Sequence, residues 1–316
     1  MIPTVSVIIP YYNRVHTIGR AIDSVLQQTM QDFEIIVVDD ASPDDLHTGV
    51  APYAGDPRIR SLRQPVNQGP GAARNTGIAA ARGRFVAFLD SDDTWLPAKL
   101  ARQTETALAA PNPDLVFCAT KTRVLLDGGR EIVRPLRGPG PGRSFAEFLY
   151  LEGGFAQTSA FFLSRALAAR VRFHEDMRQL EDHLFFIECG VAGAEYRLID
   201  EVLTVWRNES APDRASAADD LAKWSEIVRR FRERAAPLVP ERVLLAGEVR
   251  FLSGRLWEKA PARAVALMGR ALLTGALPPR QIALLFGRNV LPSRLYDTAR
   301  HLAARHGAGH SAQRTA

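Results

Sequence analysis

The sequence predicts an α/β protein with a mixed, mostly parallel sheet flanked by helices, followed by a helical C-terminal region. Two observations predict the sheet: short β-branched runs alternate with helix-like segments, and several of these runs end in acidic or polar clusters. Strands that alternate with helices form βαβ units with right-handed crossovers. The third observation is that apolar residues recur at helical spacing from Leu221 onward.

The elements of the first half follow from their apolar patterns. Val5–Ile9 is a β-branched run ended by Pro10, which is typical of a buried strand. Thr17–Gln28 has the helical spacing of a first crossover helix. The remaining elements of this half are expected to be strand 33–38, a weaker strand 59–62, helix 70–81 and strand 85–89.

The second half contains shorter elements. Residues 134–143 are dense in Pro, Gly and Arg and are expected to form a loop. Ser164 is expected to open a helix that reaches Val171. The other expected elements are helix 99–109, strand 114–119, helix 145–151, strand 160–163, helix 179–190 and a strand pair over 196–206.

Composition excludes several classes of protein. The 316 residues are 46% hydrophobic and 24% charged, which is typical of a globular protein. Cys118 and Cys189 form neither metal-ligand spacing nor a disulfide framework, as expected in a reducing compartment. The N-terminus has no basic n-region and no apolar run reaches about 18 residues, so we expect neither signal peptide nor transmembrane helix.

Charge divides the chain into two parts. Residues 221–316 carry 17 Lys and Arg against 6 Asp and Glu, whereas the preceding residues carry a net charge of −6. The basic part could meet an anionic surface, phospholipid or phosphate, or its charges could simply be solvated helix faces. Its apolar residues include Leu284, Leu285, Phe286, Val290, Leu291 and Leu295, and they alternate with Arg280, Arg288, Arg294, Arg300 and Arg305.

The stretch Phe85–Asp93 is the most informative one. A buried strand runs directly into Asp90, Asp92 and Asp93, and Asp90-Ser91-Asp92 is a DxD sequence. Crowded carboxylates repel one another, and a divalent cation between them would remove that repulsion. The alternative is a solvated acidic turn that caps the next helix, and for Asp93 we expect this capping role.

Polar clusters follow three of the predicted strands. They are Tyr11-Tyr12-Asn13, Asp39-Asp40-Ala41-Ser42 and Asp90-Ser91-Asp92-Asp93. The carboxyl ends of parallel strands lie along one edge of a sheet, where ligands of α/β proteins bind. We therefore expect one ligand site built from all three clusters.

These motifs together resemble family 2 glycosyltransferases of the GT-A fold, which have a Rossmann-type sheet. The resemblance rests on PYYNR at 10–14, SVLQQT at 24–29, FEIIVVDDAS at 33–42, NQGPGAARNTG at 67–77 and FVAFLDSDD at 85–93. It continues more weakly through Glu181-Asp182 and Trp206-Arg207, and nothing beyond about Pro212 is similar. It implies a catalytic domain over 1–211, with a nucleotide-sugar half of about 1–110 and an acceptor half of about 111–211, ahead of a basic helical region over 212–316.

The resemblance also implies an activity. We expect inverting transfer of a sugar from a nucleotide-sugar donor, usually UDP-linked, with Mn²⁺ or Mg²⁺ as the cofactor. The acceptor would be a glycan or a lipid-linked saccharide, in cell-surface polysaccharide synthesis. The expected location is the cytoplasm, with peripheral contact between residues 212–316 and the inner face of the plasma membrane.

Residue roles follow position by position from the resemblance. Asp92 matches the metal ligand, and Asp90 the position that touches ribose or the metal's water shell. Asp40 matches the acceptor for the uracil N3–H, with Asp39 beside it. The other expected donor-binding residues are Pro10, Tyr12, Arg74, Ser91 and Arg207. Asp182 is the expected general base, and Glu181 is next in line.

Other functions fit the sequence less well. A dinucleotide-binding dehydrogenase needs glycines in its first strand-to-helix turn, and PYYNRVHT has none. No nucleic-acid reader motif accompanies the basic C-terminal part. The alternative that stays open is a non-catalytic α/β protein that binds a nucleotide or nucleotide-sugar.

Overall fold

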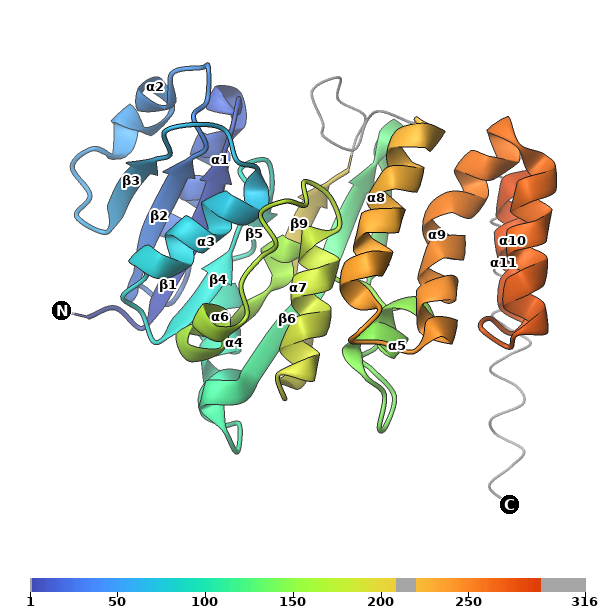
Figure 1. Ribbon diagram of the computed structural model, residues 1–316. Coiled ribbons are helices and arrows are strands. Elements are labelled where there is room, and N and C mark those ends of the chain that lie inside the picture. The colour runs from blue at the N-terminus through green and yellow to red at the C-terminus, as the bar shows by residue number, and fades with distance from the viewer. Residues whose placement is uncertain (1, 209–219, 291–316) are drawn as a thin grey trace. The chain divides into compact units, whose positions relative to one another are not determined.

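The computed structural model describes residues 2–208 and 220–290, shown in Figure 1. The chain forms two compact units. The first contains residues 1–218 and 233–238, and the second contains residues 219–232 and 239–316. The boundary expected between residues 211 and 212 lies outside the described residues.

One sheet organises the first unit. Its described strands run in the order β3-β2-β1-β4-β8-β6-β9-β5, with β7 paired to β6. The pairs among β3, β2, β1 and β4 are parallel, while β8 pairs antiparallel with both β4 and β6. The strands are β1 Val5–Tyr11, β2 Phe33–Asp39, β3 Ile59–Arg63, β4 Phe85–Phe88, β5 Thr94–Trp95, β6 Val116–Leu126, β7 Arg130–Arg134, β8 Phe162–Ser164 and β9 Glu195–Arg207. The predicted fold class is confirmed.

Helices cover both faces of this sheet. They are α1 Val15–Leu26, α2 Leu46–Val50, α3 Pro70–Ala80, α4 Lys99–Leu108, α5 Phe145–Tyr150, α6 Arg165–Arg170 and α7 Glu181–Val191. Alternate residues of a strand point to opposite faces. Val7 and Ile9 accordingly share a core with Ile22 of α1, whereas Ile8 meets Gly77 of α3.

The structure corrects the expected strand pair over 196–206. β9 is a single strand of 13 residues that pairs with β6 in parallel. The register shifts midway, because Ile199 pairs with Thr120 while Val202 pairs with Lys121. Asp200 and Glu201 fall within this bulge, so their polar character does not mark a turn between two strands. The hairpin of β6 and β7 was not predicted.

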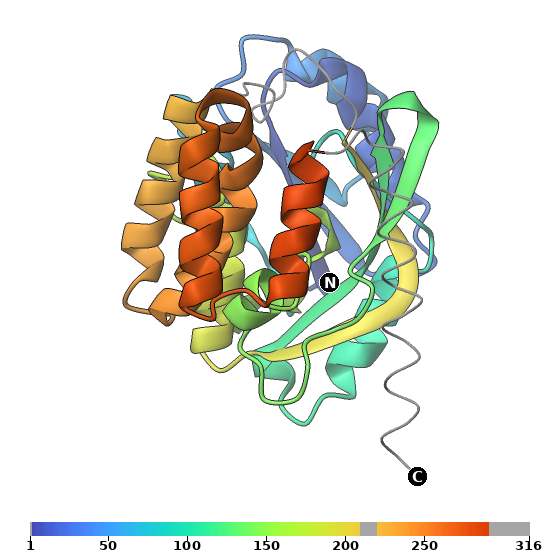
Figure 2. The ribbon, with the colours of Figure 1, turned by 90° about the vertical axis from the view of Figure 1, so that its right-hand side faces the viewer.

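The second unit is helical, as expected. It contains the first part of α8 Leu221–Ala235, followed by α9 Glu241–Lys259, α10 Pro261–Leu273 and α11 Pro279–Val290, with α9, α10 and α11 visible side by side in Figure 2. Prolines start α10 and α11, where a missing N–H costs nothing. Leu291, Leu295, Arg294, Arg300 and Arg305 lie outside the described residues.

Two aromatic pairs pack between the helices of this unit. The rings of Phe231 and Phe251 lie 6.2 Å apart, and those of Trp257 and Phe286 lie 5.1 Å apart. Among the described helices of both units, none is long and apolar enough to cross a membrane.

Candidate active site

Strained backbone marks three segments that contain predicted site residues. Asn13 and Ala41 have φ of 53°, and Leu180 has φ of 62°. A left-handed conformation costs a non-glycine residue about 1–3 kcal/mol and is concentrated at functional sites. Asn13 follows β1, Ala41 follows Asp40, and Leu180 directly precedes α7. The strain therefore falls on the loops that carry the candidate site.

The Asp40 carboxylate holds the loop that leads into α3. Its two oxygens accept the N–H groups of Gln68 and Gly69, each at 2.7 Å. Gly69 has φ of +94°, which a residue with a Cβ rarely adopts. Burial raises the pKa of Asp40, and the two N–H donors oppose this shift. The carboxylate that was expected to receive uracil thus also anchors the loop before Arg74.

Asp39 is equally buried and anchors a different loop. Its Oδ1 accepts the Ser42 N–H at 2.8 Å, and its Oδ2 pairs with Arg63 of β3. The Ser42 Oγ then accepts the N–H of Asn13 at 2.7 Å. Asp39 therefore links the segments after β1 and β2.

Arg74 joins two parts of the candidate site. Its guanidinium donates to Asp90 at 2.7 Å and to Glu181 at 2.8 Å, and its side chain is only 4% exposed. Asp90 follows β4, and Glu181 is the first residue of α7. A buried arginine between two carboxylates fixes both through charge-assisted hydrogen bonds. Arg74 therefore ties the candidate metal turn to the helix that carries the candidate base.

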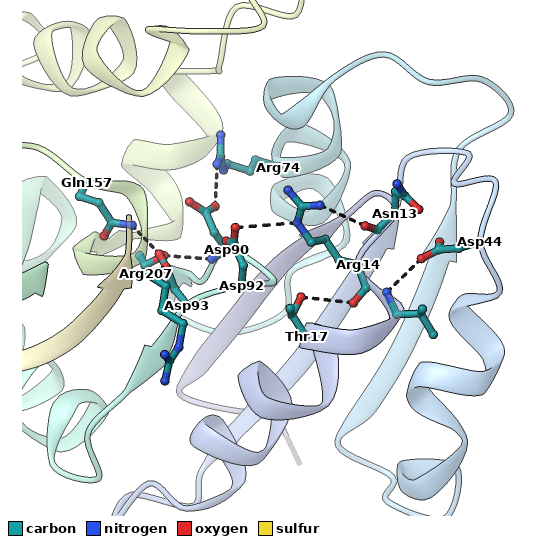
Figure 3. A network of polar contacts seen from close by, with 12 residues as sticks. Asn13, Arg14, Thr17, Asp44, Arg74, Asp90, Asp92, Asp93, Gln157 and Arg207 are labelled. Atoms are coloured by element: carbon teal, nitrogen blue, oxygen red, sulfur yellow. Dashed lines mark hydrogen bonds and ion pairs between the residues drawn. The ribbon is translucent and has the colours of Figure 1, made fainter. Parts of the chain in front are cut away.

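Asp90 and Asp92 stand where a cation could reach them. Their side chains are 29% and 26% exposed, and the Arg14 Nε lies 3.8 Å from Asp92 Oδ2 (Figure 3). Arg14 belongs to the PYYNR motif, yet no separate role was predicted for it. Its charge beside Asp92 suits it to hold this carboxylate or a phosphate.

The residues present fit a divalent cation. Among the described residues no three His, Cys, Asp or Glu side chains gather as ligands, but Mg²⁺ is commonly held by one or two carboxylates and substrate phosphates. Burial and the charges of Asp92 and Asp90 raise the pKa of Asp93 well above its usual range. Negative charge is thus concentrated at this turn, where a cation would be stabilised.

Asp93 does not cap the next helix, so that expectation was wrong. Its side chain is 1% exposed and accepts hydrogen bonds from Gln157 Nε2 at 2.6 Å and Ser159 Oγ at 2.6 Å. Its other oxygen accepts the Arg207 N–H at 3.2 Å. α4 begins only at Lys99, beyond the reach of this carboxylate as a cap.

Asp182 and Glu181 open α7, within the helix expected over 179–190. Burial raises the pKa of Asp182 to about 6, although the charge of Arg74 opposes this shift. Burial also raises the pKa of Glu181 to about 6, and Arg74 again opposes the rise. Glu181 is committed to Arg74, whereas Asp182 is half-buried and accepts the His183 N–H at 2.8 Å. Asp182 therefore has the geometry better suited to a base.

The model of the family described as glycosyl transferase family 2 matches residues 6–171, which is more than half of the chain. The chain belongs to glycosyl transferase family 2. This confirms the resemblance drawn from the motifs. The succinoglycan biosynthesis protein ExoO of Rhizobium meliloti is 36% identical over 200 residues, covering 60% of this chain and 57% of ExoO. The chain spans less than two thirds of the length of the first curated relatives that it matches.

Solved structures share the fold of this family 2 chain. The TarS structure from S. aureus with UDP-GlcNAc has a TM-score of 0.61 and 19% identity, covering 95% of this chain and 92% of that one. The mannosyltransferase PcManGT of Pyrobaculum calidifontis, in complex with GDP-Man and Mn²⁺, has a TM-score of 0.58 and 20% identity. That match covers 96% of this chain and 84% of PcManGT.

The remaining predicted donor residues of the family 2 chain differ in exposure. Tyr12 is 46% exposed, and Pro10 and Arg207 are half-buried, whereas Ser91 is only 6% exposed. The donor-binding roles of these four residues stay predictions.

Asn75 supports the candidate site, and sequence reasoning missed it. It is buried on α3, donates to the Phe173 carbonyl at 2.9 Å and accepts the Phe173 N–H at 2.9 Å. It thereby fixes the segment that leads into α7. Its place beside Arg74 in the ARNTG part of the motif was the available signal.

Proposed function

We propose that this chain is an inverting, metal-dependent glycosyltransferase of the hexosyltransferase type. It takes a sugar from a nucleotide-sugar donor, UDP-linked, and transfers it to a glycan or lipid-linked acceptor in cell-surface polysaccharide synthesis. The observation that carries the proposal is the Arg74 bridge, since it brings a DxD carboxylate and a base-bearing helix to one place. The succinoglycan role in the name of ExoO supports the proposed pathway class.

The donor site would use residues from three strand ends. Asp92 and Asp90 would hold Mn²⁺ or Mg²⁺, which when bound neutralises the diphosphate as it leaves. Asp40 and Asp39 would face the nucleobase of the donor, with Pro10 and Tyr12 along it. Tyr12 offers an exposed ring on which the nucleobase would stack. Arg207 and Ser91 would complete the diphosphate side, and Arg14 lies close enough to join them.

Asp182 would supply the general base. As the acceptor oxygen attacks C1, its proton passes to the Asp182 carboxylate. The bond from C1 to the diphosphate oxygen breaks on the opposite face, and the nucleoside diphosphate leaves with the bonding electrons. A pKa near 6 leaves Asp182 mostly deprotonated at neutral pH while keeping it basic enough to accept a proton.

The helical unit offers a surface suited to contact the membrane that would hold a lipid-linked acceptor. Residues 261–290 contain four Arg and no Asp, Glu or Lys. Leu273 on α10 is 89% exposed, Val265 is 51% exposed, and Phe286 on α11 is 42% exposed. Exposed apolar residues among cations suit an anionic phospholipid interface. Peripheral attachment at the cytoplasmic leaflet is therefore part of the proposal.

The test is a panel of nucleotide sugars, assayed for sugar release with Mn²⁺ and again with EDTA. One donor should be turned over slowly, in the presence of metal only, by the wild-type chain. Asp92→Asn should lose this turnover. Tight binding of a nucleotide sugar with no turnover of any donor, and no transfer to glycan or lipid-linked saccharides, would favour the non-catalytic alternative.

A further inference from the structure

A buried serine closes the turn that carries the candidate metal ligands. Ser159 lies in a 3₁₀ turn, Thr158–Ala160, and its side chain is fully buried. Its Oγ donates to Asp93 Oδ2 at 2.6 Å and accepts the Asp90 N–H at 3.0 Å. The Asp93 N–H donates to the Asp90 carbonyl at 3.0 Å. Both ends of the turn are thus fixed to each other and to one hydroxyl.

Asp93 fastens the same turn to distant parts of the chain. Besides Ser159, its carboxylate accepts the Gln157 Nε2–H at 2.6 Å and the Arg207 N–H at 3.2 Å, as Figure 3 shows for the latter two. Three donors satisfy the hydrogen-bonding capacity of this buried carboxyl group. The Asp93 side chain therefore faces the interior, whereas those of Asp90 and Asp92 remain about a quarter exposed.

Ser159 is itself held firmly. Its carbonyl accepts the indole N–H of Trp95 at 2.7 Å, and Trp95 is 4% exposed. The backbone N–H of Trp95 donates to the Ser24 hydroxyl at 3.1 Å. This bond connects Trp95 to α1. A hydroxyl whose own backbone is fixed in this way can define the position of the groups that it binds.

We propose that Ser159, together with Asp93 and Gln157, positions Asp90 and Asp92 for a divalent cation and the donor diphosphate. These are positioning residues, since they act through the turn and not on the substrate. The inference rests on the proposed function. Mg²⁺ demands near-ideal octahedral geometry, so the orientation of its carboxylate ligands governs affinity. Loss of groups that orient metal ligands usually lowers metal affinity by about 10–100-fold.

The chain offers a matched control for the loss of this hydroxyl. Ser6 is also fully buried, its Oγ donates to the buried Glu34 carboxylate at 2.7 Å, and it accepts the Gly83 N–H at 2.9 Å. The Ser159 hydroxyl makes the same two kinds of bond, and the Ser6 hydroxyl also accepts the Arg82 N–H at 3.2 Å. Ser6 lies near the amino end of β1, whereas the candidate site lies at the carboxyl ends of the strands. Ser6→Ala should therefore cost similar stability without disturbing the site.

The experiment measures UDP binding by calorimetry to the full chain, with Mn²⁺ and with EDTA. The ratio of the two dissociation constants is the gain that the metal supplies. Ser159→Ala should lower this gain by about 10–100-fold while leaving the affinity in EDTA unchanged. Ser6→Ala should keep the wild-type gain, although both variants should unfold at lower urea concentrations than the wild type.

Each other outcome overturns a definite statement. A full gain in Ser159→Ala, or an equal loss of affinity with Mn²⁺ and with EDTA, would overturn the positioning role. If the wild type binds UDP with the same affinity in Mn²⁺ and in EDTA, the metal dependence in the proposed function is overturned, and the positioning role is overturned as well. Should Ser159→Ala not fold, Gln157→Met removes one donor to Asp93 and keeps the serine. It should also lower the gain, and an unchanged gain there would overturn the role.

Discussion

Arg74 shows how one side chain can link substrate binding to base placement. Its sequence context suggested a partner in the nucleotide, and the structure gives it two protein carboxylates, Asp90 and Glu181. Its side chain is 4% exposed, so it is shielded from water where charge pairs are strongest. Of the two carboxylates that open α7, Arg74 binds Glu181 directly, whereas Asp182 accepts a backbone N–H. The contact with Arg74 therefore distinguishes Glu181, which has a structural partner, from Asp182, which is better placed to accept a proton.

Asp182→Asn should keep donor binding and lose most transfer. The amide cannot accept the acceptor proton, and a general base contributes about 10²–10⁴-fold to the rate. The measurement is kcat for transfer beside the UDP dissociation constant. Glu181→Gln is the control, and because it weakens the Arg74 bridge it should raise the donor dissociation constant more than Asp182→Asn does. Transfer at the wild-type rate by Asp182→Asn would assign the base elsewhere.

The pH dependence of transfer should report the same carboxylate. The pKa of Asp182 is raised to about 6, and the base works only when deprotonated. Below that pH kcat/KM should fall by about tenfold per pH unit, and above it the rate should level off. Burial lowers the pKa of the adjacent His183 to about 4, so this histidine does not produce a limb near 6.

The residual rate of Asp182→Asn supplies the control for that profile. It should vary little through the same range, because the titrating base is gone and the pKa of Glu181 falls once the charge of Asp182 no longer raises it. A wild-type kcat/KM that stays level from neutral pH down to about 5 would show that no base with the raised pKa limits transfer.

At the scale of the elements, α3 is placed by a close approach to β1. A Cβ on Gly77 would lie 2.3 Å from the Ile8 Cγ2, and Ile8 is fully buried. Gly77 lies one turn beyond Arg74 on the same helix, so this contact sets the distance between Arg74 and the sheet. The packing of one glycine thereby affects the placement of a site residue.

Gly77→Ala should destabilise the protein. Overpacking a core costs about 1–3 kcal/mol. Alanine favours a helix over glycine by only about 1 kcal/mol, so the clash should exceed that gain in most of this range. Gly269→Ala on α10 makes the same change where the added Cβ would meet no described residue outside its own turn of helix within 4 Å, and it should stabilise. Urea midpoints for both variants test this, and a stabilised Gly77→Ala would show that α3 can move away from β1.

Local patterns predicted the elements whose causes are local. The runs of β1, β2 and β4 are apolar on both faces because helices cover both, and α7 begins at Glu181, two residues after the expected start of the helix. β9 was misread because its bulge depends on register with β6, a partner about 80 residues away. No single-sequence pattern encodes that pairing.

The candidate site shows the same limit. The motifs named Asp90, Asp92 and Asp182, because these residue types belong to the chemistry itself. They did not reveal that Asp93 faces inward, since its donors Gln157 and Ser159 come from a segment without any motif. The orientation of Asp93 depends on contacts between segments that are far apart in the sequence, and a local motif does not show which distant residues will meet it.

At the scale of the whole molecule, charge separates the two parts of the chain. The acidic first part carries the candidate catalytic residues, and the basic part is helical over its described residues, 221–290. Within α10 and α11 every ionisable side chain is an arginine, although Arg270 pairs with Glu241 of α9 at 3.2 Å. An interface between two copies of this face would bring arginines together, which disfavours such a dimer. An anionic lipid surface has the complementary charge.

The full chain should therefore pellet with anionic liposomes and not with neutral ones. Each basic residue near such a surface contributes roughly 1 kcal/mol, so Arg263→Gln with Arg280→Gln should weaken binding by about tenfold or more. Leu272→Ser with Leu273→Ser should weaken it as well, since both leucines are exposed and their burial in lipid would be lost.

The control for charge is Arg229→Gln with Arg230→Gln. It removes the same charge from α8, where both arginines pair with Glu226, and should change binding little. Equal loss in both arginine pairs would mean that overall charge, and not the α10–α11 face, meets the membrane, and no pelleting by the wild type would remove the membrane from the proposal.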